Sequence, residues 1–278
     1  MLSRAFVLRG ALVFERYLVP VYLPRWVHEP LVKLKRLYVP PAPIDEGCQV
    51  PQAFTEQFSQ FKEQSCLDGR FQPKQADWFP FLNDATPATG FDAHYVLHTS
   101  WAARVLAKTK PKVHVSFGDS LYFVGIASAF VSMTFCDIRK SGLPFRDIEE
   151  GTADLTSLPP SWTGTLQSIS CMHVLEHIGL GRYGDTLDAS GDRKAAAELA
   201  RVLAPGGQLL MVVPMEEPPR VCFNAHRLYS YSQVADLFPT LSLLEFTLIT
   251  NEGEFFENAD PGLLKGRKYL CGCFRFTK

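Results

Sequence analysis

From Lys112 onward, apolar runs alternate with segments of helical periodicity, and this alternation constrains the fold more than any other feature. The run Gln208–Pro214 is almost entirely apolar, as expected of a strand buried on both faces of a parallel sheet. Strands that alternate with helices predict such a sheet. The other predicted strands are Val113–Phe117, Ser132–Cys136, Thr165–Met172, Leu241–Thr250 and Tyr269–Phe276. No good helix separates the last two, which predicts an antiparallel hairpin at the sheet edge.

Three segments have helical periodicity: Phe91–Leu106, Ser120–Phe130 and Asp192–Ala204. In the third, Asp192 is suited to cap the first turn, and Pro205-Gly206-Gly207 ends the helix. Several prolines interrupt the helical patches between residues 20 and 51, because proline cannot continue a helix interior. The sequence therefore predicts an irregular helical extension over residues 1–105 and an α/β domain over residues 106–278.

The N-terminal segment, residues 1–36, carries seven basic and two acidic side chains among bulky apolar ones. Arg9, Glu15 and Arg16 interrupt any secretory signal, and the charge-free stretch Tyr17–Pro24 is too short to span a bilayer. Two interpretations are open. We favour helical packing against the main domain over peripheral contact with an anionic membrane surface.

Charge and cysteine content narrow the class of protein. The net charge of -1 gives no electrostatic case for binding nucleic acid. The seven cysteines are odd in number and form no CxxC pair. They predict free thiols in a reducing, cytoplasmic setting rather than disulfides or a zinc site.

Polar residues follow the predicted strands where a parallel sheet binds its ligands. Gly118 ends the first strand and allows a ligand to approach the backbone closely. Asp137 ends the second strand and is placed to accept the hydroxyls of a ribose, although a helix cap or loop acid fits equally well. Asp154 would accept from an adenine amino group while Leu155 packs on the ring; the alternative is an ordinary turn.

Two longer strings resemble a known superfamily. SISCMHVLEHI followed by ELARVLAPGGQLLMVVP resembles strand four, helix and strand five of class I S-adenosylmethionine-dependent methyltransferases. HVLEHIGLGRYGD and FNAHRLY resemble an uncharacterised methyltransferase-like family often encoded among bacterial surface-polysaccharide genes. The resemblance covers roughly residues 75–276. It departs at the first loop, where Ser116 replaces the usual acid and Ser120 and Tyr122 replace common glycines.

The resemblance implies a Rossmann-like, mostly parallel sheet with an antiparallel last strand, and S-adenosylmethionine as the cofactor. The implied cofactor-binding residues are Gly118, Ser120, Asp137, Asp154, Leu155 and Met172.

His173, Glu176 and His177 crowd the end of the fourth predicted strand. Structural hydrogen bonding is the plainest interpretation. A divalent metal site is the second, with His226 as a fourth ligand. A zinc-protease helix is discounted, because a strand precedes the cluster and glycines follow it. Separately, His173 or His226 is a candidate general base for methyl transfer.

We therefore expect a cytoplasmic methyltransferase acting on a hydroxyl of a sugar or glycan precursor. Arg182, Tyr183 and Asp185 lie in a polar loop that would bind the sugar. The first alternative is a catalytically degenerate binding or scaffold protein of the same fold in polysaccharide biosynthesis, favoured by the altered first loop. A nicotinamide-dependent oxidoreductase is less favoured, because the GxGxxG fingerprint is absent after the first strand.

Overall fold

The computed structural model describes residues 50–80, 82–83, 85–87, 89–142, 144 and 146–278. The chain divides into two units, Met1–Gly90 and Phe91–Lys278. Helix α4 (Ala93–Thr109) falls in the second unit, whereas the sequence assigned most of this helix to the extension. It does so because α4 buries Trp101 and Leu106 in the core of that unit. The basic segment 1–36 lies outside the described residues, so both interpretations of it stay predictions.

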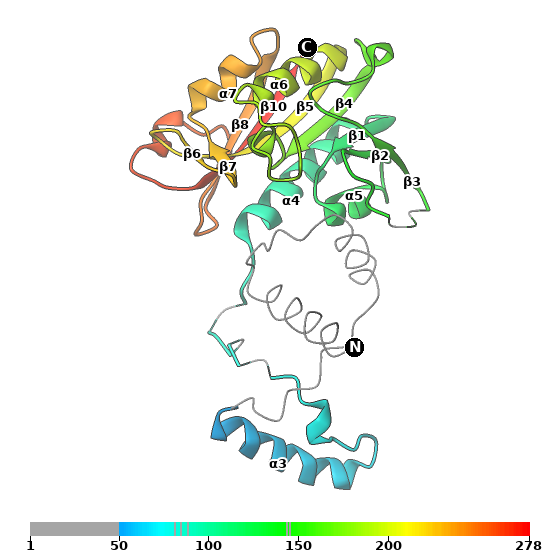
Figure 1. The fold of residues 1–278 in the computed structure, drawn as a ribbon, viewed down its shortest axis with the longest axis vertical. Coiled ribbons are helices and arrows are strands. Elements are labelled where there is room, and N and C mark those ends of the chain that lie inside the picture. The colour runs from blue at the N-terminus through cyan, green and yellow to red at the C-terminus, as the bar shows by residue number, and fades with distance from the viewer. Residues whose placement is uncertain (1–49, 81, 84, 88, 143, 145) are drawn as a thin grey trace, which may run out of the picture. The chain divides into compact units, whose positions relative to one another are not determined.

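In the first unit, the described part contains helix α3 (Gln52–Asp68), drawn in blue in Figure 1. Two of its aromatic side chains, Phe54 and Phe58, pack edge-on against the ring of Trp78, with ring centroids 5.1 and 5.2 Å apart. Helix α3 ends at Gly69, whose positive φ of 71° is typical of a glycine cap. No described helix has both the length and the apolar character needed to cross a membrane.

Within the described residues of the second unit, eight strands form one sheet in the order β3-β2-β1-β4-β5-β10-β8-β9 (Figure 1). Their bounds are β1 Val113–Phe117, β2 Ser132–Asp137, β3 Ile148–Thr152, β4 Leu166–Met172, β5 Leu203–Met215, β8 Ser242–Ile249, β9 Phe255–Phe256 and β10 Leu270–Thr277. Strands β1 to β5 are parallel, and β10 is antiparallel to both β5 and β8. The predicted Rossmann-like fold class is confirmed.

The last two predicted strands pair antiparallel as expected, but β10 does not lie at the sheet edge. It is inserted between β5 and β8, and β9 takes the edge position. The reason is burial: Cys271, Cys273 and Phe274 on β10 are all fully buried, so the strand needs a covered position on both faces.

Strand β5 and helix α6 (Gly191–Val202) meet earlier than predicted. The helix ends at Val202 because Leu203 adopts an extended backbone, and β5 runs through Pro205-Gly206-Gly207. Asp192 does not cap the helix either, because Ser190 is the N-cap residue. Asp192 lies inside the first turn, where its Oδ2 accepts a hydrogen bond from the hydroxyl of Tyr229 at 2.9 Å.

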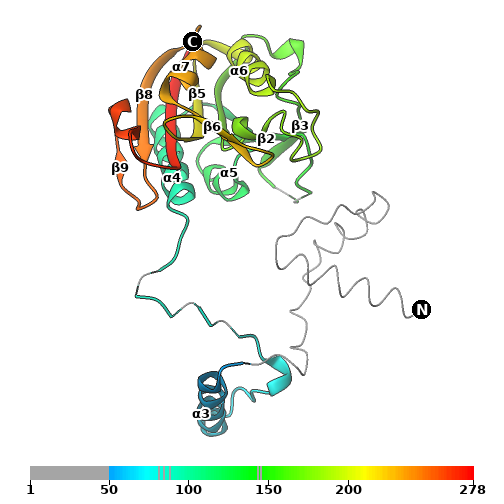
Figure 2. The same ribbon diagram turned by 60° about the vertical axis from the view of Figure 1, so that its left-hand side comes forward.

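The core lies on both faces of the sheet, and β5 contributes to each in alternation. Leu209, Met211 and Val213 pack with α6 and α7 (Tyr231–Leu237). Leu210 and Val212 pack with α4 and α5 (Leu121–Ala127). Figure 2 shows the two pairs of helices on opposite sides of the sheet. This double burial fixes the strand ends on which the site is built.

Candidate functional site

A pocket of about 790 Å³ opens at the carboxyl ends of β1, β2, β3 and β4. This is the edge at which open parallel sheets bind ligands. Eight of the residues predicted to form a site line it: Gly118, Asp137, Asp154, Leu155, His173, His177, Tyr183 and Asp185. The sequence therefore located the edge of the sheet and part of the lining of this pocket.

Gly118 and Asp137 face each other across the mouth of β1 and β2. Gly118 has a φ of +70°, and a Cβ on it would lie 3.0 Å from Val174 Cγ2 and 3.5 Å from Asp137 Oδ2. Asp137 Oδ1 accepts a hydrogen bond from the backbone N–H of Arg139 at 2.8 Å, and its side chain is 21% exposed. The absence of a side chain at residue 118 thus leaves the carboxylate accessible from the pocket.

Asp154 and Leu155 line the next stretch of the pocket. Asp154 is exposed, and its Oδ1 accepts from the backbone N–H and the hydroxyl of Thr156 at 2.8 and 2.7 Å. Leu155 is buried and belongs to the core cluster that includes α6. Two other predicted cofactor residues do not line the pocket. Ser120 is the N-cap residue of α5, and Met172 packs in the core beneath the sheet edge.

The acid that the sequence lacked at residue 116 stands three residues later. Asp119 is buried and accepts hydrogen bonds from the hydroxyls of Ser116 and Ser170 and from the backbone N–H of Met172. Burial raises the pKa of Asp119 to about 6 despite these bonds. The carboxylate therefore ties β1 to β4 directly below the pocket. The position of an acid immediately after Gly118 was the signal that the sequence reasoning overlooked.

The predicted histidine cluster forms a short 3-10 turn, η3 (Leu175–His177), rather than an α-helix. Glu176 Oε1 lies 3.0 Å from His173 Nδ1 and 3.7 Å from His177 Nε2. Burial lowers the pKa of His173, but hydrogen bonds with Cys271 and Glu176 outweigh burial and raise this pKa to about 10. His173 also has a φ of +57°, a backbone conformation that non-glycine residues rarely adopt.

His177 is held by the chain segment that precedes β7 (His226–Leu228). Its Nδ1 donates to the carbonyl oxygen of Ala225 at 2.6 Å, and the ring of His226 lies 6.4 Å from the His177 ring. Burial is the main cause of a lowered pKa at both His177 and His226. The structure therefore brings the four predicted metal residues into one neighbourhood, although His226 and Glu176 do not line the pocket.

The predicted four-residue metal set does not form. Among the residues that the structure describes, the group of His, Cys, Asp and Glu ligand atoms that all lie within 4.8 Å of one another comes from His98, His173 and Cys271. Only His173 is shared with the prediction. Ala225 holds the His177 ring through its Nδ1, and the ring centroid of His226 lies 6.4 Å from that of His177.

The polar loop after η3 is held in shape by hydrogen bonds between its own backbone N–H groups and the side chain of Asp185. Asp185 accepts from the N–H groups of Gly179, Gly181 and Tyr183 at 2.7, 3.3 and 3.2 Å, so its carboxylate is committed within the loop. A Cβ on Gly179 would collide with the carbonyl of Asp188, so only glycine fits there. Asp185 also lines the pocket, and its role in binding sugar stays a prediction.

Tyr183 from this loop lies over the pocket between two guanidinium groups. Arg139 lies 4.5 Å and Arg182 lies 5.1 Å from the centroid of the ring. Arg139 and Tyr183 both line the pocket, and neither Arg139 nor the contact was predicted. The loop thus contacts Arg139, which follows β2, and both side chains line the pocket.

The comparison with known families gives one match. Residues 129–254, a little under half of the chain, match a family described as Caenorhabditis protein of unknown function, DUF268. The matched range includes η3, the polar loop and α6. No curated protein matches the chain.

Three solved structures illustrate the similarity of the fold. The 1,6-didemethyltoxoflavin-N1-methyltransferase of Burkholderia thailandensis, with S-adenosylhomocysteine bound, has a TM-score of 0.46 and 14% identity over 85% of this chain and 94% of its own. The N-methyltransferase NodS of Bradyrhizobium japonicum WM9, also bound to S-adenosylhomocysteine, has a TM-score of 0.46 and 16% identity over 71% of this chain and 90% of its own. A TehB-like methyltransferase of Corynebacterium glutamicum has a TM-score of 0.44 and 14% identity over 82% and 100%.

Proposed function

We propose that this chain is an S-adenosylmethionine-dependent methyltransferase. The observation that carries the proposal is the pocket at the carboxyl ends of β1 to β4, in a sheet of this order, with Gly118, Asp137 and Leu155 at its successive strand ends. Nucleoside ligands of open α/β sheets bind at this edge, with a glycine at the first strand and an acid at the second.

The residues present fit such a cofactor. The pocket volume of about 790 Å³ lies within the range of roughly 300–1,000 Å³ usual for small-molecule sites. Asp137 would accept the ribose hydroxyls, and Leu155 would pack on the adenine ring. When bound, S-adenosylmethionine supplies a methyl group that its sulfonium already activates. The contribution of the protein is to align the acceptor with that methyl.

His177 is the group best placed to remove a proton from the acceptor. Its Nδ1–H is committed to Ala225, so Nε2 carries the lone pair, and the residue lines the pocket. His173, the base predicted from the sequence, has both ring nitrogens engaged, by Glu176 and by Cys271. His226 packs behind His177 and would act through it as a positioning residue.

For the acceptor we propose a hydroxyl of a sugar or glycan precursor. A sugar hydroxyl is weakly acidic, so its methylation needs a base at the reacting oxygen, and His177 supplies one. Arg139 and Tyr183 offer hydrogen-bond donors and an aromatic ring at the mouth of the pocket. The net charge of -1 offers no complementary surface for nucleic acid.

A non-catalytic scaffold of the same fold is the alternative, and the first loop is its motivation. The substituted positions do not obstruct the pocket, however. Tyr122 is 87% exposed, and neither it nor Ser120 lines the pocket. The changes in this loop are therefore compatible with cofactor binding.

Calorimetry tests the proposal. We expect S-adenosylmethionine and S-adenosylhomocysteine to bind the wild-type protein. Asp137→Ala should weaken that binding by about tenfold or more, because an accepting carboxylate is lost. Glu257→Ala, which removes an exposed acid, is the matched control. No heat of binding in the wild type would favour the scaffold.

A second experiment identifies the acceptor: S-adenosylmethionine with a labelled methyl group should label nucleotide sugars or lipid-linked glycans. Label on protein or nucleic acid alone would overturn the proposed acceptor.

A further inference from the structure

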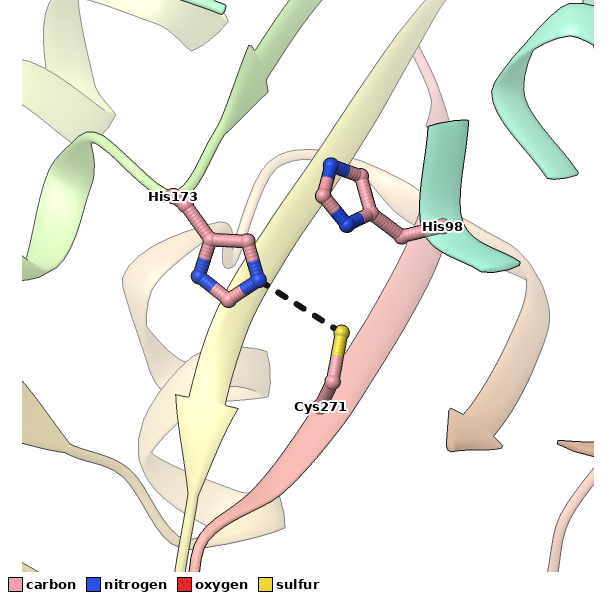
Figure 3. Close-up of side chains that lie close together, drawn as sticks. All are labelled: His98, His173 and Cys271. Carbon is pink, nitrogen blue, oxygen red and sulfur yellow. Dashed lines mark hydrogen bonds between the residues drawn. The ribbon is translucent and has the colours of Figure 1, made fainter. Parts of the chain in front are cut away.

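Three side chains from distant parts of the chain converge below the pocket (Figure 3). His98 comes from α4, His173 follows β4, and Cys271 lies on β10. One ligand atom from each lies within 4.8 Å of the other two, and His173 Nε2 is 3.6 Å from Cys271 Sγ. Cys271 is fully buried, His98 is 1% exposed, and the side chain of His173 is 8% exposed.

One nitrogen of each imidazole is held by an acceptor. His98 Nδ1 lies 2.7 Å from the carbonyl oxygen of His94, and His173 Nδ1 lies 3.0 Å from Glu176 Oε1. In Figure 3, His173 faces Cys271 with its Nε2, whereas His98 faces the cluster with its Nδ1. Glu176 therefore orients His173 through the nitrogen away from the cluster, as a carboxylate does for many metal-binding histidines.

Unpaired polar atoms are buried beside the cluster. Buried polar atoms cost free energy when they lack partners. In the described part of the chain, buried side-chain nitrogens and oxygens without a hydrogen bond include His94 Nε2 and Glu176 Oε2, both next to this cluster. The strained positive φ of His173 turns its ring toward β10, and such strain is usually kept where a site requires it.

We propose that His98 Nδ1, His173 Nε2 and Cys271 Sγ bind a zinc ion, with His98 exchanging its hydrogen bond to His94 for the ion and moving its proton to Nε2. Two imidazoles and one thiolate match the ligand preferences of zinc. Zinc bonds of about 2.0 Å to nitrogen and 2.3 Å to sulfur place tetrahedral ligands about 3.5 Å apart, close to the 3.6 Å between His173 and Cys271. On binding, the Cys271 thiol releases its proton to solvent, and a fourth position stays open for water or another ligand.

This site is distinct from the metal set that the sequence predicted, and it reverses the prediction that Cys271 is a simple free thiol. The sequence could not reveal it, because His98 lies in a helix and Cys271 in a strand with no metal-binding spacing between them. The site does not depend on the proposed methyl transfer. It ties α4, β4 and β10 together at the wall of the pocket, which His173 also lines.

Metal analysis of the full-length protein tests the proposal. After equilibration with zinc and removal of loosely bound metal, we expect one zinc ion per chain in the wild type. Cys271→Ala and His98→Ala should each lose it, while Cys171→Ala should retain it, since Cys171 is equally buried but belongs to the other core cluster. Glu176→Gln should weaken zinc binding by about 10- to 100-fold, because it alters only the acceptor of His173.

A spectroscopic measurement on the wild type covers the case in which the variants fail to fold. Cobalt in place of zinc should give a thiolate-to-metal charge-transfer band together with tetrahedral d–d bands. Absence of the charge-transfer band would overturn the proposal, as would full zinc occupancy in a folded Cys271→Ala variant. Preference for copper(I) over zinc in direct competition would also overturn the assignment of the metal.

Discussion

The pocket and the buried cluster of His98, His173 and Cys271 meet at His173, and they differ in how their polar groups are exposed to water. On the pocket side, a glycine without a side chain opens the strand end, and Asp137 keeps part of its carboxylate in contact with solvent. On the other side, His98 and Cys271 are closed off from water, and each buried atom depends on a partner inside the protein.

This difference in exposure to water determines which kind of ligand each region can bind. Water can replace a ligand in the pocket, so a molecule that enters and leaves during turnover suits it. The closed cluster cannot exchange its contents with comparable ease, because opening it exposes core residues of α4 and β10. The pocket is therefore suited to a substrate, and the cluster to a resident ion.

The largest effect should come from a change that disables the pocket and leaves the cluster intact. His177→Gln removes the proposed base and should lower kcat about 10²- to 10⁴-fold. Affinity for S-adenosylmethionine and zinc content should change little, because His177 is proposed to act on the acceptor and is not one of the proposed zinc ligands. Single-turnover kinetics with the identified acceptor measures the loss of rate. If kcat in the variant equalled that of the wild type, His177 would not be the base.

The buried carboxylate below the pocket gives the next effect, on stability. Burial raises the pKa of Asp119 from 3.8 to about 6, which corresponds to about 3 kcal/mol. Because the folded-state pKa is raised, this stability is fully present below about pH 4 and is lost as the pH rises through 6. Urea titrations should show wild type losing about 3 kcal/mol relative to Asp119→Asn across that window. A gain for wild type over the same range would mean that the hydrogen bonds to Ser116 and Ser170 outweigh burial.

A third change closes the pocket at its first strand. Gly118→Ala places a methyl group 3.0 Å from Val174 in a backbone with a φ of +70°. We expect cofactor affinity to fall about tenfold or more, with a loss of stability of roughly 1–2 kcal/mol from the backbone strain. Gly90→Ala is the control, because its Cβ would meet no atom within 4 Å. Unchanged affinity in a folded Gly118→Ala variant would show that the cofactor does not pass close to β1.

The smallest effect concerns the loop over the pocket. Tyr183→Ala removes two stacking contacts with Arg139 and Arg182, each worth about 0.5–1 kcal/mol at an exposed site. The acceptor KM should rise a few-fold while cofactor affinity is kept. Tyr183→Phe, which preserves the ring, should behave as wild type. If only cofactor affinity changed, the loop would contact the cofactor rather than the acceptor.

The sequence predicted the parts of the site that lie near one another along a strand and its following turn. The pattern around Gly118, Asp137 and Asp154 located the pocket, because parallel strands share one carboxyl edge. It predicted Tyr183 as part of a sugar-binding loop, but it did not predict Arg139 or the contact between the two, which forms only through the folding of the loop after η3. It also missed the cluster below the pocket, since His173 and Cys271 are 98 residues apart and meet only through the packing of β10.

The fold was predicted where periodicity was unambiguous. Strand β1 was predicted with its observed bounds, but the start of β5 was not, since Pro205-Gly206-Gly207 is typical of a turn and here lies within a strand. The antiparallel pairing of β8 and β10 was predicted, but the hairpin was expected at the sheet edge, which β9 occupies instead. The other neighbour of β10, strand β5, is distant in sequence, and no local signal specifies that pairing.

The insertion of β10 between β5 and β8 has a consequence for the order of events in folding. Strand β8 precedes β10 along the chain, yet it pairs in the sheet only with β10 and β9. The pair of β8 and β10 therefore joins the parallel half of the sheet only when β10 docks beside β5. Such non-local pairing is slow, because the chain loses the entropy of loop closure before the stabilising contacts between the strands form. Cys271 arrives with that late strand, so the ligand set of the proposed ion is completed only when the sheet closes, and metal uptake would report the final step of assembly.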